Sequence, residues 1–472
     1  MNTRSKIAGL VLASATLAVS NGAMATNGYF THGVGTQSKG MAGTGIGSNA
    51  DMGAIMSASN PALGVFTSDR WEAGLSLFSP MRSYEASASQ LNGGLIDLGG
   101  GVFLPSHTIN QGKFDSSSEF FPIPYVAKNW SLKNDANLTF AFYGRGGMNT
   151  DWDDSNATAT SYFCGGDPTQ GQPPATGPGP YCSGDAGVDL SQAFITFNYA
   201  AMAGENFAFG IGPVFALQMF EANGVAVFAP VTETFAASGG TVLPTSLSNN
   251  GHDTSYGFGL AAGLWWGLSD TVSVGLAYQT KMSMSEFDDY SDLFAEGGGF
   301  DIPSSIKAGI SFVASEALRV NFDIEHTAYS DVDSIGNPMM NLVSCPTLPL
   351  GGTSTAHCLG GASGAGFGWE DMTTYKLGFE YASSETNTWR FGYSYGEQPI
   401  QAADVLFNVL APGVMEQHVT FGLTRKRANG GAWNFSFMYA PENSVTGPSM
   451  FDPTQTLELS MSQFEFEVGI SF

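Results

Sequence analysis

Large apolar residues recur at every second position in many short stretches of this chain. In residues 272–278, small residues alternate with four apolar ones, Val272, Val274, Leu276 and Tyr278. The same alternation recurs in residues 389–395, 433–439 and 464–472, and the chain ends on Phe472. Because successive side chains of a strand point to opposite faces, each stretch predicts a β-strand with one apolar face.

The connections between these strands fall into two length classes. Short polar turns near residues 204–206, 269–270, 315–316, 384–387 and 429–431 alternate with long segments near residues 84–118, 155–188, 224–252, 284–302, 330–369, 396–416 and 441–456. Short turns at one end and long loops at the other are typical of bacterial outer-membrane barrels. We therefore expect an all-β protein, a transmembrane antiparallel β-barrel of about 14 strands.

The first 25 residues predict a cleaved signal peptide. Arg4 and Lys6 precede an apolar run over residues 7–19, and Ala23-Met24-Ala25 fits a small-x-small cleavage site. The apolar run is too short for a spanning helix, and no later run reaches about 18 apolar residues. The expected location is the bacterial outer membrane.

The charge of the chain excludes one class of partner and suggests another. A formal net charge of −25 with only 17 scattered basic residues makes nucleic-acid binding improbable. Acidic runs at residues 151–154 and 287–292 fall in expected loops, where they are either solvated or able to bind calcium, which bridges lipopolysaccharide phosphates. The expected partners are a hydrophobic small molecule, outer-membrane lipid and lipopolysaccharide, and we expect a monomer.

Four cysteines lie in two loop segments rich in glycine, proline and serine. An even number in an exported chain favours disulfides, and four cysteines allow three connectivities. We favour local pairing, because each bond then closes one long loop: Cys164 with Cys182, and Cys345 with Cys358. The alternative is a zinc site, but no pair has close metal spacing and His357 lacks partners. We expect no metal and no cofactor.

If the large apolar residues face lipid, the lumen receives charges of both signs. This set comprises Lys307, Arg319, Asp323, Glu325, Lys376, Glu380, Arg390, Glu465 and Glu467. Such charges can pair across the lumen. A gated or specific conduit is therefore favoured over a wide ion channel.

Residues 26–68 do not alternate and predict a plug, which we call the hatch, ahead of the barrel at residues 69–472. The alternative is a disordered tail, but the segment contains six apolar residues from which a solvated tail gains nothing: Tyr29, Phe30, Val34, Met41, Ile46 and Met52. A glycine-rich segment on the periplasmic side is able to fold back into the lumen. We expect the hatch to plug the barrel.

Several motifs resemble the FadL/TodX family of outer-membrane transporters for long-chain fatty acids and other hydrophobic compounds. They are Gly40-Met41-Ala42-Gly43, Asn60-Pro61-Ala62 and residues 408–414 leading into 418–422. The loop architecture extends the resemblance over essentially the whole mature chain. It implies a fourteen-stranded barrel with a hatch, in which a ligand binds among extracellular loops and leaves at a kinked third strand.

The third strand is expected at residues 137–150, and it contains Gly144, Gly146 and Gly147. Glycine inside a strand marks a bulge or a bend, although close packing against the hatch is an equal alternative. The implied ligand groove draws on the third and fourth long loops and consists of Phe228, Phe235, Leu243, Leu247, Phe287, Leu293, Phe294 and Phe300.

The resemblance also implies a carboxylate-binding cation on the fifth strand, but the strand expected there, residues 207–220, contains no Arg or Lys. Arg145 and Lys281 are substitutes, and a neutral hydrocarbon or aromatic substrate stays open. The favoured function is passive, ligand-gated uptake of hydrophobic small molecules, and the alternative is a general porin or surface adhesin. Six dispersed histidines form no apparent catalytic set, so we expect no enzyme.

Overall fold

The computed structural model describes residues 27–153, 157–428 and 430–472, so the expected signal peptide lies outside the described residues. The chain forms a closed antiparallel barrel of 14 strands. Its strands are β1 (Arg70–Ala86), β6 (Phe121–Ser131), β7 (Ala136–Trp152), β10 (Ala186–Met202), β11 (Phe207–Asn223), β12 (Asp253–Gly267), β13 (Val272–Gln279), β15 (Ser305–Val313), β16 (Leu318–Thr327), β17 (Met372–Ala382), β18 (Asn387–Gly396), β19 (Gln417–Lys426), β20 (Ala432–Ser449) and β21 (Asp452–Ser471).

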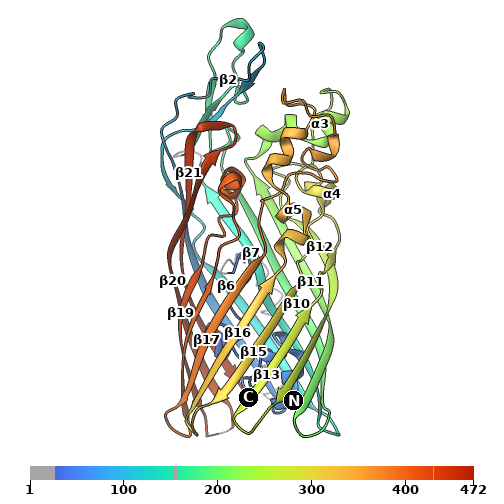
Figure 1. Cartoon of the computed structure of the whole chain (residues 1–472), viewed down its shortest axis with the longest axis vertical. Helices are drawn as coiled ribbons and strands as arrows, with labels where there is room; N and C mark the ends of the chain where they lie inside the picture. Colours follow the sequence, from blue (N-terminus) through green and yellow to red (C-terminus); the bar gives the residue numbers. More distant parts are fainter. Residues whose placement is uncertain (1–26, 154–156, 429) are drawn as a thin grey trace, which may run out of the picture.

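Consecutive barrel strands pair with each other, and β21 closes the circle by pairing with both β20 and β1. The last residue takes part, since the Phe472 N–H donates to the Trp71 carbonyl at 2.9 Å. Closure leaves no free sheet edge in lipid, where unpaired backbone groups cost several kcal/mol each. The short turns gather at one end of the barrel and the long loops at the other, as Figure 1 shows.

The outward faces of the strands are apolar. Tyr256 and Phe258 are 70% and 65% exposed, while their neighbour Ser255 is buried against the lumen. The alternation read from the sequence therefore separates a lipid face from a lumen face. None of the described helices is long and apolar enough to span a membrane.

The extracellular loops and the hatch contain short strands and helices. The extracellular loops hold β2 (Leu95–Asp97), β3 (Phe103–Pro105), β4 (His107–Ile109), β5 (Gly112–Asp115), β8 (Thr158–Ser161), β9 (Ala175–Pro178), β14 (Ser283–Met284), η3 (Pro168–Gln170), η4 (Ala226–Val231), α3 (Glu233–Ala237), η5 (Asp288–Tyr290), α4 (Ala295–Gly298), η6 (Tyr329–Asp331), α5 (Asp333–Gly336), η7 (Met339–Ser344), η8 (Thr355–His357), η9 (Ala402–Asp404) and α6 (Val405–Asn408). The hatch holds α2 (Thr36–Lys39), η1 (Ala54–Ala58) and η2 (Pro61–Phe66).

The prediction of a long loop at residues 441–456 is wrong. β20 continues to Ser449 and β21 begins at Asp452, so this segment is mostly a strand hairpin. The pairing register shifts between Ala440 and Asn443, where Pro441 and Glu442 form a bulge. Proline cannot donate to a strand ladder, and an inserted residue reverses the alternation that follows it. Because of this reversal, the alternation in the sequence did not predict a strand at residues 441–456.

Candidate functional site

The hatch lies in the lumen on a row of glycines contributed by the barrel wall. A Cβ atom added to Gly275 would lie 1.9 Å from the Ile46 carbonyl oxygen, and one added to Gly392 would lie 2.3 Å from the Met41 carbonyl carbon. The same close approach of hatch and wall holds at Gly210, Gly263, Gly309, Gly378 and Gly422. We call these seven residues the glycine cradle, and it brings the hatch into backbone contact with the wall.

The Gly40-Met41-Ala42-Gly43 motif forms the turn that follows α2. Met41 and Ala42 are fully buried, and Ala42 and Gly43 have φ values of 56° and 82°. The Ala42 N–H donates to Thr420 Oγ1 on β19 at 2.8 Å. This turn joins the hatch to the wall.

Asn60-Pro61-Ala62 forms the start of η2. The Asn60 side-chain oxygen accepts from the Ala62 N–H at 3.0 Å, which caps the helix, and Pro61 occupies its first position. The Asn60 amide donates to Ile46 O at 2.9 Å and to Leu264 O on β12 at 3.2 Å. The motif therefore ties two hatch segments to the barrel wall.

A buried cation fastens the hatch to the last strand. Lys39 Nζ lies 2.6 Å from Glu467 Oε2 and 2.5 Å from Glu465 Oε1, and all three side chains are buried. Burial lowers the pKa of Lys39, but Glu465 and then Glu467 raise it more, so it stays above its usual value. The pKa of His32 falls well below its usual value because of burial and then the charge of Lys39. His32 beside this pair is therefore neutral.

The first described residues of the hatch pair with β7 at a bulge. The Thr31 N–H donates to Arg145 O at 2.9 Å and the Gly147 N–H donates to Tyr29 O at 3.0 Å, with Phe30 opposite Gly146. The pairing of β7 with β10 shifts register between Gly144 and Gly146. Gly144, Gly146 and Gly147 thus lie at or beside the bulge, in the strand expected to kink.

Beyond Tyr143, β7 no longer pairs with its neighbouring barrel strand β6. Its pairing with β6 ends at Tyr125 opposite Tyr143, although β7 continues to Trp152. We call the stretch of β7 that is not paired with β6 the β6/β7 gap. A polar recess of about 730 Å³ borders it, lined by residues that include Phe121, Asn149 and Val188.

An apolar cavity lies among the extracellular loops above the lumen. It is lined by Val188, Phe220, Val225, Phe228, Leu293, Phe294, Ser334, Leu359, Ala365, Gly366, Phe367, Phe407 and Leu410. Its volume is about 30 Å³, room for only about two water molecules. The side chains therefore close the cavity almost completely.

The expected groove residues divide into three groups. Phe228, Leu293 and Phe294 line the cavity. Leu247, Phe287 and Phe300 are buried within the same apolar cluster, where Phe220 contacts both Phe287 and Phe294. Phe235 and Leu243 do not line the cavity, and Leu243 is 68% exposed.

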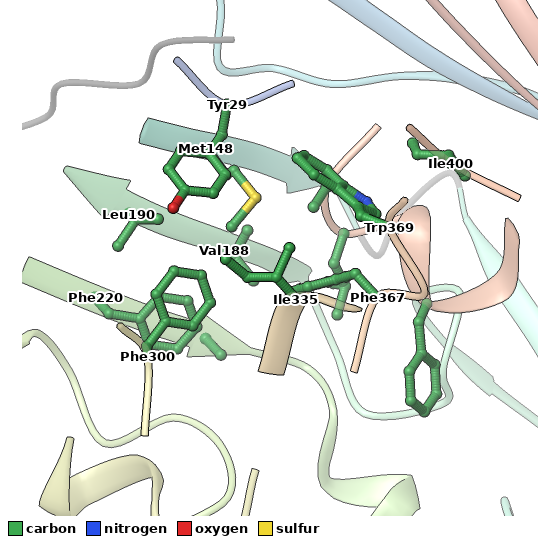
Figure 2. Packing of buried hydrophobic residues seen from close by; sticks show 14 of the residues in the cluster. Tyr29, Met148, Val188, Leu190, Phe220, Phe300, Ile335, Phe367, Trp369 and Ile400 are labelled. Atoms are coloured by element: carbon green, nitrogen blue, oxygen red, sulfur yellow. The ribbon is translucent and has the colours of Figure 1, made fainter. Parts of the chain in front are cut away.

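Sequence reasoning named Tyr29 and Phe300 but missed the other aromatic side chains that connect this cavity to the hatch, Tyr329, Phe367 and Trp369. The Tyr29 ring lies 5.2 Å from Tyr329, 6.0 Å from Trp369 and 6.3 Å from Phe300. Figure 2 shows Tyr29 beside Met148 and Leu190, with Trp369, Phe367 and Phe300 in the same cluster. These rings come from four separate segments, so no local pattern brings them together.

Neither expected carboxylate-binding cation is available in this structure. Arg145 donates to Gln279 and to Ser305 Oγ at 3.0 Å, and its guanidinium lies 4.4 Å from the Phe30 ring centre. Lys281 contacts Asp301 at 3.2 Å and donates to Asp331 O at 2.9 Å. Each already has its partners within the protein.

Both cysteine pairs form local disulfides, Cys164–Cys182 and Cys345–Cys358, with Cα atoms 5.5 Å and 4.9 Å apart. His107 lies close to the first pair. Because its two sulfurs are bonded to one another, they are not thiolate ligands for zinc. Each bond closes one extracellular loop.

Comparison with known proteins gives a family match and a set of similar structures. A family model described as outer membrane protein transport protein (OMPP1/FadL/TodX) matches residues 178–424. The fold is similar to the Pseudomonas putida toluene transporter TodX, with a TM-score of 0.60, 16% identity and coverage of 93% of this chain and 98% of that one. A Pseudomonas aeruginosa FadL homologue matches with a TM-score of 0.59 and 14% identity over 94% and 99%.

The Ralstonia pickettii toluene transporter TbuX is also similar, with a TM-score of 0.53 and 14% identity over 92% of this chain and 98% of that one. A search of curated protein sequences finds no match.

Proposed function

The chain belongs to the OMPP1/FadL/TodX family of outer membrane transport proteins, so it is an outer-membrane transporter of hydrophobic compounds and not an enzyme, and we propose that its ligand opens it by moving the hatch. The proposed route has three parts: capture in the apolar cavity, displacement of the first hatch residues, and release through the β6/β7 gap.

Capture relies on the apolar lining of the cavity. Among the described residues that line it, Ser334 is the one with a polar side chain. Burial stabilises a ligand by about 0.8 kcal/mol per methylene, which suits molecules that barely dissolve in water. Because the cavity is almost closed, a ligand enters only if aromatic side chains such as Phe228 and Phe294 swing aside.

Displacement follows from the contacts of Tyr29. Its ring packs in the aromatic cluster under the cavity, while its carbonyl accepts from Gly147 at the β7 bulge. A ligand that spreads these rings would also pull residues 29–31 away from β7. This pairing between hatch and bulge is the observation that carries the proposal.

Release is proposed at the β6/β7 gap, where β7 is not paired with β6. Val188 lines both the apolar cavity and the polar recess, so its side chain lies between the two spaces. Removal of residues 29–31 would free the Arg145 carbonyl and the Gly147 N–H at the gap. A hydrophobic ligand leaving there would enter the lipid without crossing the polar periplasmic mouth.

A reversible lock tests this function. Phe30→Cys with Gly146→Cys would join the hatch to the bulge, since the two residues lie opposite each other. A cysteine at position 146 would bring its Cβ close to the end of the Gln192 side chain, which is flexible and can move aside. We expect oxidised cells carrying both substitutions to lose uptake of hydrocarbon and fatty-acid probes, and reductant to restore it. Either single variant, with and without reductant, is the control. Unchanged uptake in the locked protein would contradict hatch movement.

A further inference from the structure

The polar recess beside the β6/β7 gap is acidic, and the transport route described above does not use its charges. Five carboxylates line it: Glu119, Asp151, Asp185, Asp189 and Glu221. None of the described residues that line it is a lysine or an arginine. Carboxylates gathered in one recess create a negative potential, which attracts a cation.

Two side chains bring positive charge to the edge of this recess. His252 Nε2 lies 3.1 Å from Asp189 Oδ2, and its Nδ1 lies 2.9 Å from Glu221 Oε2. Arg82 Nη1 donates to the carbonyl of Ser118, a lining residue, at 3.3 Å. Even with His252 protonated, these two groups supply two positive charges against five carboxylates. The recess therefore keeps a net negative charge.

The strand ladder places several of the lining side chains next to each other. Asn149 of β7 lies opposite Asp189 of β10, and directly opposite residues have Cβ atoms about 5 Å apart. Asp151 lies two positions from Asn149 on β7, and such residues share one side of a strand with Cα atoms roughly 7 Å apart. One amide and two carboxylates are therefore within reach of a single ion.

Asn149 provides a second observation that is independent of the acidic charge. Its side chain is 7% exposed, and its Oδ1 has no hydrogen-bond partner among the described residues. Its neighbour Met148 belongs to the apolar cluster, so Asn149 points to the opposite face, into the recess that it lines. A buried amide oxygen is unfavourable unless a donor or a cation meets it.

The donor atoms identify the class of cation. Carboxylate and amide oxygens, completed by water, are the ligands of calcium, which accepts flexible geometry, whereas magnesium demands a near-ideal octahedron. Zinc prefers sulfur and imidazole nitrogen. His252 does not line the recess, and both of its ring nitrogens already face carboxylates. The oxygen donors of the recess therefore favour calcium.

We propose that Asn149, Asp151 and Asp189 bind a calcium ion in the polar recess, with water completing its coordination. Of the acidic run at residues 151–154, Asp151 thus contributes to the site, and Asp154 lies outside the described residues. With two carboxylates and one amide, we expect a Kd on the order of 10⁻⁴–10⁻³ M, the range of extracellular calcium modules. The site requires the closed barrel and is independent of ligand gating.

The test measures binding of radioactive calcium by equilibrium dialysis, on the full-length barrel in detergent, after chelator treatment and without lipopolysaccharide. Asn149→Leu removes the amide oxygen, and Asp189→Asn removes one charge at nearly constant size. Each should weaken saturable calcium binding at least about tenfold, since even partners behind the ligands are worth that much. Asn149→Asp keeps an oxygen there and should bind at least as tightly as the unmodified protein.

Asp97→Asn is the matched control for charge, because Asp97 is an exposed carboxylate of β2 that does not line the recess. It should bind calcium as the unmodified protein does. Heat-modifiable gel mobility establishes that each variant is folded before binding is measured.

Four results would overturn the proposal. The first is an unmodified protein that shows no saturable calcium binding. The second is unchanged binding in Asn149→Leu, or a loss in Asp97→Asn equal to that in Asp189→Asn, because diffuse negative charge would then explain the attraction. The third is displacement of calcium by an equal concentration of magnesium or zinc. The fourth is binding that occurs only when lipopolysaccharide is added, which would assign the ion to lipid phosphates.

Discussion

Lys39 is a single residue on which we expect closure of the hatch to depend. Its ammonium group lies between Glu465 and Glu467 in a site that excludes water. Removing one partner of a buried ion pair costs about 3–5 kcal/mol, because the remaining charges lose their compensation. The cost here falls on the contact between α2 and β21, and not on the strand ladder.

Lys39→Met should therefore loosen the hatch while the barrel stays folded. We expect a clear rise in steady ion conductance in planar bilayers, with heat-modifiable gel mobility unchanged. Lys133→Met, an exposed lysine in the turn between β6 and β7, is the control and should conduct as the unmodified protein does. Equal conductance of the two variants would show that the pair does not hold the hatch.

The charge of Lys39 also predicts how closure depends on pH. Its pKa is raised above the unfolded value, so its contribution is complete below about pH 10 and is lost only as pH rises through the folded value. His32 stays neutral, because its pKa is lowered by burial and by Lys39. We expect conductance of the closed barrel to be constant between pH 7 and pH 9. A step in that range would contradict this electrostatic account.

At the scale of elements, the hatch and the bulged strand β7 contact each other directly. The hatch contacts the wall through the glycine cradle, and its first residues complete the free edge of β7. The barrel ladder is nevertheless continuous without the hatch, since each strand pairs with its neighbours. We therefore expect the barrel to fold without the hatch.

Deleting residues 27–50 tests this separation. The deletion removes Lys39 and the pairing with β7, so we expect a folded barrel with raised conductance and reduced selective uptake of hydrophobic probes. Single-channel recording and radiolabelled uptake in a deletion strain measure the two effects. A barrel that is unchanged in both would mean that the segment does not gate.

At the scale of the whole molecule, we expect stability to come from the closed strand ladder and not from the loops. Both disulfides lie in extracellular loops, away from the strands that pair around the barrel. Reduction should leave the circular-dichroism spectrum dominated by strand and the gel mobility heat-modifiable, because closure satisfies the strand hydrogen bonds. Loss of strand signal on reduction would contradict this view.

Local pattern alone was sufficient for the architecture. Alternation with a period of two, a short turn after every second strand and glycines in the third strand are properties of neighbouring residues, and they predicted the barrel and the place of the bulge. The cysteine pairs were also local, with separations of 18 and 13 residues. One bulge at Pro441 was enough to hide the ends of two strands.

The tertiary structure alone decided which groups meet in the lumen. Lys39 and Glu467 are 428 residues apart, and Tyr29 meets Tyr329 and Trp369 from distant loops. The lumen charges were visible in the sequence, but their partners were not. The reason is physical. Strand periodicity depends on residues next to each other, whereas ion pairing and burial depend on how the barrel closes and where the hatch enters it.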